Sequence, residues 1–257
     1  MKEIYKNRIQ NLAYFMYEEN LGCCVFIDNE EHRDPAVNYF SGHPSDAILL
    51  IFSDGYSILL PWDENLAKER AVVNKIVPFT RYERDYVKAA SGLLKLLKVP
   101  GNTKVEIPSS ISYPEFLHFV DGLSNYDVIC REDGTEAYAT NLRAVKDEYE
   151  VDCIRTASKI TDKLVDIIEE KLKSGEIQTE IDVALLIEKE CRLLGCEGPG
   201  FDTLAAGPAR SFAIHCFPPY TSGAFPGEGL SILDFGVKYK GYTSDVTVTV
   251  AKGNLSE

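Results

Sequence analysis

Two aspartates near the C-terminal end of the sequence, Asp234 and Asp245, have a spacing that could support metal chemistry. They lie in the segment 231–249, where apolar and polar residues alternate on both sides of a short polar turn. This alternation predicts two β-strands joined by a tight turn, with one carboxylate on each strand. Carboxylates that face each other repel unless a cation or a proton lies between them, and they are ligands for hard divalent cations. The segment therefore predicts about half of a two-metal hydrolytic centre.

The position of the turn sets the predicted register of this hairpin. A two-residue turn at 239–240 would pair Lys238 with Gly241 and place Asp234 directly opposite Asp245. Directly opposed residues have Cβ atoms roughly 4.5–5.5 Å apart. A bulge at Gly241 would shift the register by one residue and remove this arrangement. The alternative interpretation is a surface hairpin with two solvated aspartates.

The composition of the 257-residue chain limits its partners and its compartment. A hydrophobic content of 45% provides a sizeable core for one or two domains, and a formal net charge of −13 argues against nucleic acid and anionic membranes as partners. No apolar run approaches the roughly 20 residues that a membrane span requires, and the N-terminal segment does not resemble a signal peptide. Seven cysteines, an odd count without a Cys-x-x-Cys spacing, fit reduced thiols in a cytoplasmic protein.

Strands and helices alternate in the first part of the sequence, which predicts an α/β domain over residues 1–142. The predicted strands are 23–27, a hairpin within 46–60, 72–77, 104–107 and 126–130, and the predicted helices are 1–20, 65–71, 83–98 and 113–123. Residues 39–44 are predicted to form a loop that could border a substrate cleft. The polar stretch 131–143 predicts a domain boundary, and helices at 147–173 and 179–194 open a second domain, 143–257.

His215 precedes a pair of prolines and lies upstream of the aspartate hairpin. A lone histidine before prolines is more often structural than catalytic. Its position in the chain nevertheless makes it the candidate catalytic residue. His32 and His118 have no visible partners in the sequence and are not candidates.

The segment 233–249 resembles the metal-binding hairpin of the pita-bread metallopeptidases. That family includes Xaa-Pro aminopeptidase (aminopeptidase P), Xaa-Pro dipeptidase (prolidase), methionine aminopeptidase and the metal-free relative creatinase. Residues 142–157 resemble the first helix of its catalytic domain, and residues 201–207 with His215 resemble the next block. Residues 39–42, followed by the turn at 54–55, are similar to the N-terminal domain of the prolidase, aminopeptidase P and creatinase branch.

The resemblance implies a fold and a ligand set. The expected fold is α/β, with a creatinase-like N-terminal α/β domain followed by an incomplete pita-bread (α+β) catalytic domain. Of five metal ligands in the family, Asp234 and Asp245 match the two aspartates, with Asp245 bridging; a histidine and two glutamates lie further along. This chain has no histidine after His215 and only Glu257 after Asp245. The expected cofactors are two divalent metal ions, manganese first and cobalt or zinc as alternatives, held weakly or not at all by this chain.

The resemblance also implies a function. It predicts a cytoplasmic dinuclear-metal hydrolase, a homodimer that cleaves the bond before proline in short proline-containing peptides, with His215 as the catalytic residue. This chain alone is expected to be inactive because the downstream ligands are absent. Two alternatives stay open. A non-catalytic pita-bread module that binds protein partners is favoured by Val248, which stands where the family usually has arginine. A metal-free amidinohydrolase like creatinase would have no need of two intact aspartates.

Overall fold

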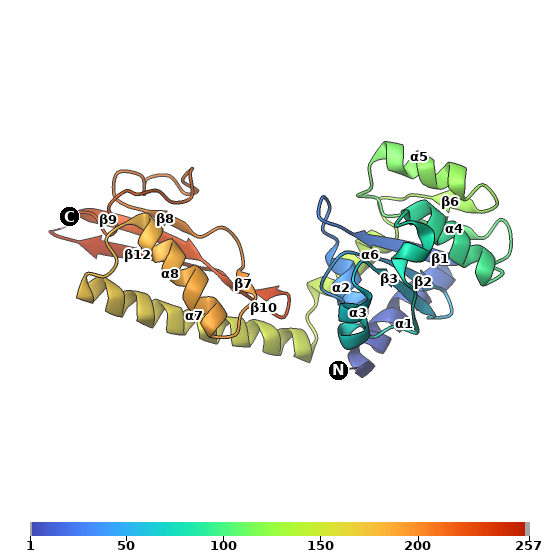
Figure 1. Cartoon of the computed structure of the whole chain (residues 1–257), viewed down its shortest axis with the longest axis horizontal. Helices are drawn as coiled ribbons and strands as arrows, with labels where there is room; N and C mark the ends of the chain where they lie inside the picture. The colour runs from blue at the N-terminus through green and yellow to red at the C-terminus, as the bar shows by residue number, and fades with distance from the viewer. Residues whose placement is uncertain (1, 255–257) are drawn as a thin grey trace. The chain divides into compact units, whose positions relative to one another are not determined.

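The computed structural model describes residues 2–254, so Glu257 lies outside the described residues. Contacts between Cα atoms divide the chain into two compact units, Met1–Lys146 and Asp147–Glu257. The boundary predicted at 142/143 falls inside helix α6 (Thr135–Ala144), which occupies most of the polar stretch 131–143. Each unit has its own sheet structure and its own core, and Figure 1 labels most of the elements of both.

The first unit is built on a six-stranded mixed sheet. Its strand order is β4-β3-β2-β1-β5-β6. Strand β2 pairs antiparallel with β1 and with β3, and the other neighbours pair parallel. The strands are β1 (Cys23–Asp28), β2 (Ala47–Phe52), β3 (Ser57–Pro61), β4 (Lys75–Ile76), β5 (Lys104–Glu106) and β6 (Asp127–Ile129).

Helices cover both faces of this sheet (Figure 1). Successive residues of β1 point to opposite faces, so Val25 packs under α4 and α5 while Phe26 packs under α1 and α2. The helices are α1 (Lys2–Glu18), α2 (Pro35–Ser41), α3 (Glu64–Arg70), α4 (Tyr86–Leu96), α5 (Tyr113–Gly122) and α6, with a 3₁₀ turn η1 (Phe79–Tyr82) before α4. Two buried clusters, one on each face, form the core and account for the nearly unbroken apolar sequence of β1 and β2.

Helix α2 corrects the prediction of a loop at 39–44, because residues 39–41 are its last turn and are buried. The Asp34 side chain accepts a hydrogen bond from the backbone N–H of Ala36 and caps the helix, and Pro35 occupies its first position. Gly42 ends the helix in the left-handed conformation with φ 72°. The loop prediction was wrong because the start signal at Asp34 and Pro35 lies outside the segment 39–44, and Gly42 was taken as part of a loop instead of the end of a helix.

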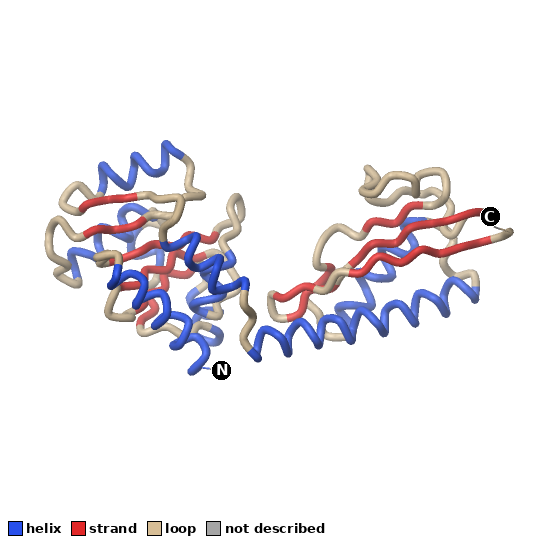
Figure 2. The backbone as a smooth tube through the Cα atoms, turned by 180° about the vertical axis from the view of Figure 1, so that it is seen from behind, coloured by secondary structure: helices blue, strands red, loops and turns tan. Residues whose placement is uncertain are grey.

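The second unit packs two helices, α7 (Glu148–Ser174) and α8 (Glu180–Leu193), on one side of two short antiparallel sheets (Figure 2). The sheet orders are β12-β9-β8 and β11-β10-β7. The strands are β7 (Gly198–Pro199), β8 (Leu204–Ala206), β9 (Gly229–Phe235), β10 (Val237–Tyr239), β11 (Tyr242–Thr243) and β12 (Val246–Lys252). Leu164 of α7 and Ile187 of α8 meet Leu233 and Phe235 of β9 in the core.

Both helices of this unit begin with a capping box. Asp147 and Glu150 form one at the start of α7, and Thr179 and Asp182 form one at the start of α8. Among the described residues, 2–254, none of the helices has the length and apolar character needed to cross a lipid bilayer.

Candidate active site

The hairpin carries both aspartates, but in a register that differs from the prediction by two residues. The pairs Lys238–Thr243 and Tyr239–Tyr242 leave 240–241 as the two turn residues. Asp234 therefore lies opposite Thr247, and the prediction that it directly faces Asp245 is wrong. The physical reason is the turn itself. Lys240 and Gly241 both have positive φ, 50° and 82°, as a two-residue hairpin turn of type I′ requires, and the prediction had treated Gly241 as a strand residue.

A shift of two residues keeps the two aspartates on the same face, because side chains alternate along a strand with a period of two. Asp245 comes two residues before Thr247, so it is the diagonal neighbour of Asp234. Diagonal neighbours have Cα atoms roughly 7–8 Å apart, still within reach of each other's side chains. Asp234 is half-buried, Asp245 is exposed, and the Thr247 hydroxyl donates a hydrogen bond of 3.0 Å to Asp234 Oδ1.

The opposite face of the same strands is apolar. Leu233 and Phe235 are fully buried against α7 and α8, and Val246 and Val248 pack against the same cluster. Val248, which stands where the related family usually has arginine, therefore lies on the helix-facing side and pairs with Leu233. Its side chain packs towards the helices and is not part of the face that carries Asp234.

Ser244 ties the residue before Asp245 to both the sheet and helix α7. The backbone N–H of Val237 donates to Ser244 Oγ over 3.0 Å, and Ser244 Oγ lies 2.6 Å from Thr161 Oγ1. Because Thr161 donates its own hydroxyl proton to the carbonyl of Ala157, it accepts the proton of Ser244. The backbone that carries Asp245 is thus fixed to the rigid part of the unit.

The loop that carries His215 lies on the aspartate side of the sheet. Cys216 packs against Leu204 and Ala206 of β8 and against Ile232, whose side chain shares a face with Asp234. His215 itself is exposed. Burial raises the pKa of the Cys216 thiol, with nearby Arg210 opposing the shift, so Cys216 is a neutral packing group and a poor nucleophile.

The structure thus brings Asp234, Asp245 and the loop of His215 to one face of the sheet. Two carboxylates with a nearby hydroxyl are hard oxygen donors, and they fit part of the donor set of a divalent cation. Within residues 2–254, no group of three or more His, Cys, Asp or Glu side chains is arranged to hold a metal ion. The described residues therefore supply two carboxylates of such a site and no third ligand.

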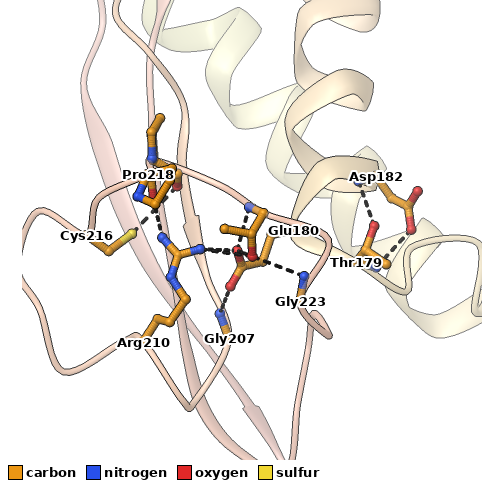
Figure 3. A network of polar contacts seen from close by, with 10 residues as sticks. Thr179, Glu180, Asp182, Gly207, Arg210, Cys216, Pro218 and Gly223 are labelled. Carbon is orange, nitrogen blue, oxygen red and sulfur yellow. Dashed lines mark hydrogen bonds and ion pairs between the residues drawn. The ribbon is translucent and has the colours of Figure 1, made fainter.

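A buried polar network at the base of the His215 loop was not predicted. Its centre is Glu180, 1% exposed at the start of α8, which forms an ion pair with Arg210 and accepts hydrogen bonds from Thr221 (Figure 3). In the sequence, Glu180 has the pattern of an ordinary acidic residue in the first turn of a helix. Its partners are 27–41 residues away in the chain, so no local signal could have found them.

Comparison with known proteins agrees with this arrangement. Residues 152–257 match metallopeptidase family M24. The match covers nearly the whole of the second unit. The resemblance to the pita-bread family, inferred above from the hairpin, is thereby confirmed.

Relatives and solved structures cover both units. The Xaa-Pro dipeptidases of Pyrococcus horikoshii and Pyrococcus furiosus are 25% and 28% identical to the chain over 99% and 98% of its length, and over 67% and 66% of their own. The X-Pro aminopeptidase of Thermotoga maritima superimposes with a TM-score of 0.77 at 22% identity, over 97% of this chain and 66% of that chain. The Xaa-Pro dipeptidase of Bacillus anthracis superimposes with a TM-score of 0.77 at 21% identity, over 98% of this chain and 66% of that chain.

These similarities confirm the predicted α/β fold, which is that of the prolidases and X-Pro aminopeptidases. The chain spans about two thirds of the length of these relatives. The relatives are peptidases of a metal-dependent family, so this chain is related to hydrolases that use metal ions.

Proposed function

We propose that this chain is part of a dinuclear-metal peptidase of the Xaa-Pro dipeptidase and aminopeptidase P type, which hydrolyses the peptide bond before proline in short peptides. The observation that carries the proposal is the common face of Asp234 and Asp245, in the segment that matches family M24. Two carboxylates on one face are hard oxygen donors for a divalent cation, so the arrangement, in a segment that matches a metal-dependent family, supports metal binding.

Each residue of the site has a separate task in this proposal. Asp234 and Asp245 hold divalent ions, which when bound supply a metal-activated water and polarise the scissile carbonyl. The Thr247 hydroxyl orients the Asp234 carboxylate through its hydrogen bond. His215, carried by the loop on the same side of the sheet, donates a hydrogen bond to the oxyanion that develops on the scissile carbonyl.

The proposed substrate is a dipeptide or short peptide with proline in the second position, in line with the names of the relatives. We propose manganese as the metal, a homodimer as the assembly and the cytoplasm as the compartment. All seven cysteines are free thiols, which supports a reducing compartment.

The experiment is an assay of proline release from an Xaa-Pro dipeptide, with the matching Xaa-Ala dipeptide as substrate control. A chain extended by the histidine and the two glutamates that the family has further along, and loaded with manganese, should cleave the first and spare the second, whereas residues 1–257 alone should cleave neither. His215→Ala should lower kcat by about 10²-fold or more, as loss of one oxyanion donor does. Asp245→Asn should lose metal and activity together, whereas Asp166→Asn on the exposed face of α7 should change neither.

Three results would contradict the proposal. An extended, metal-loaded chain that cleaves neither dipeptide would leave the non-catalytic binding module as the remaining interpretation. Unchanged turnover in His215→Ala would return His215 to a structural role. Hydrolysis of an amidino substrate in the presence of a chelator would favour the metal-free amidinohydrolase.

A further inference from the structure

We propose that Glu180 and Arg210 form an anchor that sets the position of His215, so that both act as positioning residues; this inference rests on the function proposed for His215. The anchor lies at the base of the segment 207–223, on the far side of the loop from solvent. It connects that segment to the first turn of α8 (Figure 3).

Arg210 ties together the two sides of the loop around His215. Its Nη1 donates to Glu180 Oε2 and, over 3.1 Å, to Thr221 Oγ1. Its Nη2 donates to the carbonyl oxygen of Pro218. Arg210 precedes His215 in the chain and Pro218 follows it, so a single planar guanidinium closes the segment 210–218 from both ends.

Glu180 fixes this closed segment to the body of the unit. Its Oε1 accepts from the backbone N–H of Gly207 over 2.8 Å, and its Oε2 accepts from the N–H and the hydroxyl of Thr221 over 2.7 and 2.6 Å. Its own backbone N–H donates to the carbonyl of Gly223. The N-terminus of α8 also favours a negative charge at this position. Because α8 is held in the core by Val183 and Ile187, the anchor is attached to a rigid element.

Apolar burial does little to order the segment around His215. Phe212, Ile214 and Phe217 are 86%, 81% and 93% exposed, and Cys216 and the half-buried Ala213 are its contacts with the apolar cluster on the sheet. Ordering a backbone segment costs conformational entropy that some other interaction must offset. Two other hydrogen bonds hold the segment to the sheet, from Ser211 Oγ to the carbonyl of Leu230 and from the N–H of Ala205 to the carbonyl of Pro219. The anchor adds charged hydrogen bonds that join both ends of 210–218, so it fixes where His215 lies above the aspartate face.

The test compares Arg210→Lys with Arg192→Lys. Like Arg210, Arg192 is an ion-paired arginine, but it lies in α8. Its partners are Glu188 and the carbonyl of Glu197, which are not part of the loop. A lysine at 210 keeps the charge and loses the planar fork that reaches Glu180 and Pro218 together. Glu180→Gln is a second variant, which keeps one acceptor oxygen and removes the charge.

Two readouts require no catalysis. The first is the ¹³Cε1–¹H NMR signal of His215, assigned with His215→Ala, and the second is amide hydrogen exchange in 207–223. In Arg210→Lys the His215 signal should shift or broaden while those of His32, His43 and His118 stay in place. Exchange in the segment should rise about tenfold or more, since a hydrogen bond to a charged group is lost. Arg192→Lys should leave both unchanged. An unshifted His215 signal with unchanged exchange in both anchor variants would overturn the inference.

A kinetic readout separates positioning from general stability. If the wild-type protein cleaves Xaa-Pro dipeptides, Arg210→Lys should lower kcat more than it raises KM. In the His215→Ala background the same change should have no further effect on kcat, because the anchor acts through His215. An equal loss of kcat in both backgrounds would contradict the inference. If the wild type cleaves no such peptide even after the downstream metal ligands are added, the proposed function fails, and the spectroscopic readouts alone decide the role of the anchor.

Discussion

The hydroxyl pair of Thr161 and Ser244 gives the sharpest test of how the fold holds Asp245. Ser244 is 7% exposed and Thr161 is 4% exposed, so neither hydroxyl can exchange its partner for bulk water. Thr161→Val keeps the shape of the side chain and removes the acceptor of the Ser244 proton. A buried donor left without a partner costs about 1–3 kcal/mol, and we expect the second unit to lose that much free energy of unfolding.

A double-mutant cycle isolates the contribution of the pair. Ser244→Ala should cost a similar amount, because it leaves the N–H of Val237 without its side-chain acceptor. The double variant should be more stable than the sum of the single effects predicts, by roughly 1 kcal/mol, since the lost interaction is then counted once. Thr156→Val on α7 is the control, because the hydroxyl of this half-buried residue donates to the helix carbonyl of Asp152 and joins no other element.

Urea denaturation followed by a probe in the second unit measures these differences. The two units can unfold separately, so the transition of the second unit has to be fitted by itself. Strictly additive effects in the cycle, or a Thr161→Val variant as stable as the wild type, would refute the claim that this pair fixes the strand that carries Asp245.

Two further predictions concern single positions. Burial raises the pKa of Asp34 to about 6 from an ordinary value of 3.8. The folded protein therefore binds this proton more tightly than the unfolded chain does, and its free energy of unfolding falls as pH rises from about 4 to 6. At 1.4 kcal/mol per pKa unit the loss is about 3 kcal/mol. Asp34→Asn keeps the cap on α2 and removes the charge. Thermal melts should therefore show the variant more stable than the wild type at pH 7 and equally stable at pH 4. A difference in melting temperature that stays the same at both pH values would contradict burial as the cause. Gly236→Ala should destabilise the second unit by more than about 3 kcal/mol, because a Cβ there overlaps the carbonyl oxygen of Ser244, whereas Gly101→Ala, with ordinary contact to Asn125, should have little effect in the same denaturation assay.

The sequence predicted the parts of the site that depend on local pattern. Strand alternation placed Asp234 and Asp245 on one face, and the helix predicted at 179–194 agrees with α8 and its N-cap Thr179. The register could not be predicted from the sequence, because it depends on which two residues form the turn. A turn at 239–240 and a turn at 240–241 both give a two-residue hairpin, but they pair different residues of the two strands. The positive φ of Lys240 and Gly241 in the structure decides between them.

The features that were missed depend on contacts between distant segments. Helix α6 begins at Gly134 without a side-chain cap, and Glu106 of β5 accepts the hydrogen bond from the N–H of Thr135 instead. The anchor at Glu180 depends in the same way on Arg210 and Thr221, which join it only after the loop has folded back over the sheet. Burial of a charged residue is a property of the folded chain, and a one-dimensional pattern does not show it.

The central claim is that Asp234 and Asp245 together bind a divalent cation, and paramagnetic broadening by manganese tests it most directly. Titration of manganese into ¹⁵N-labelled protein should first broaden the amide signals around Asp234 on β9 and around Asp245 at the start of β12. The method detects weak binding as well as tight binding, so it does not depend on a complete set of ligands. The broadening should disappear in a variant that carries both Asp234→Asn and Asp245→Asn, and persist in Asp166→Asn. Broadening that remains in the double variant, or that appears first elsewhere in the protein, would contradict the claim.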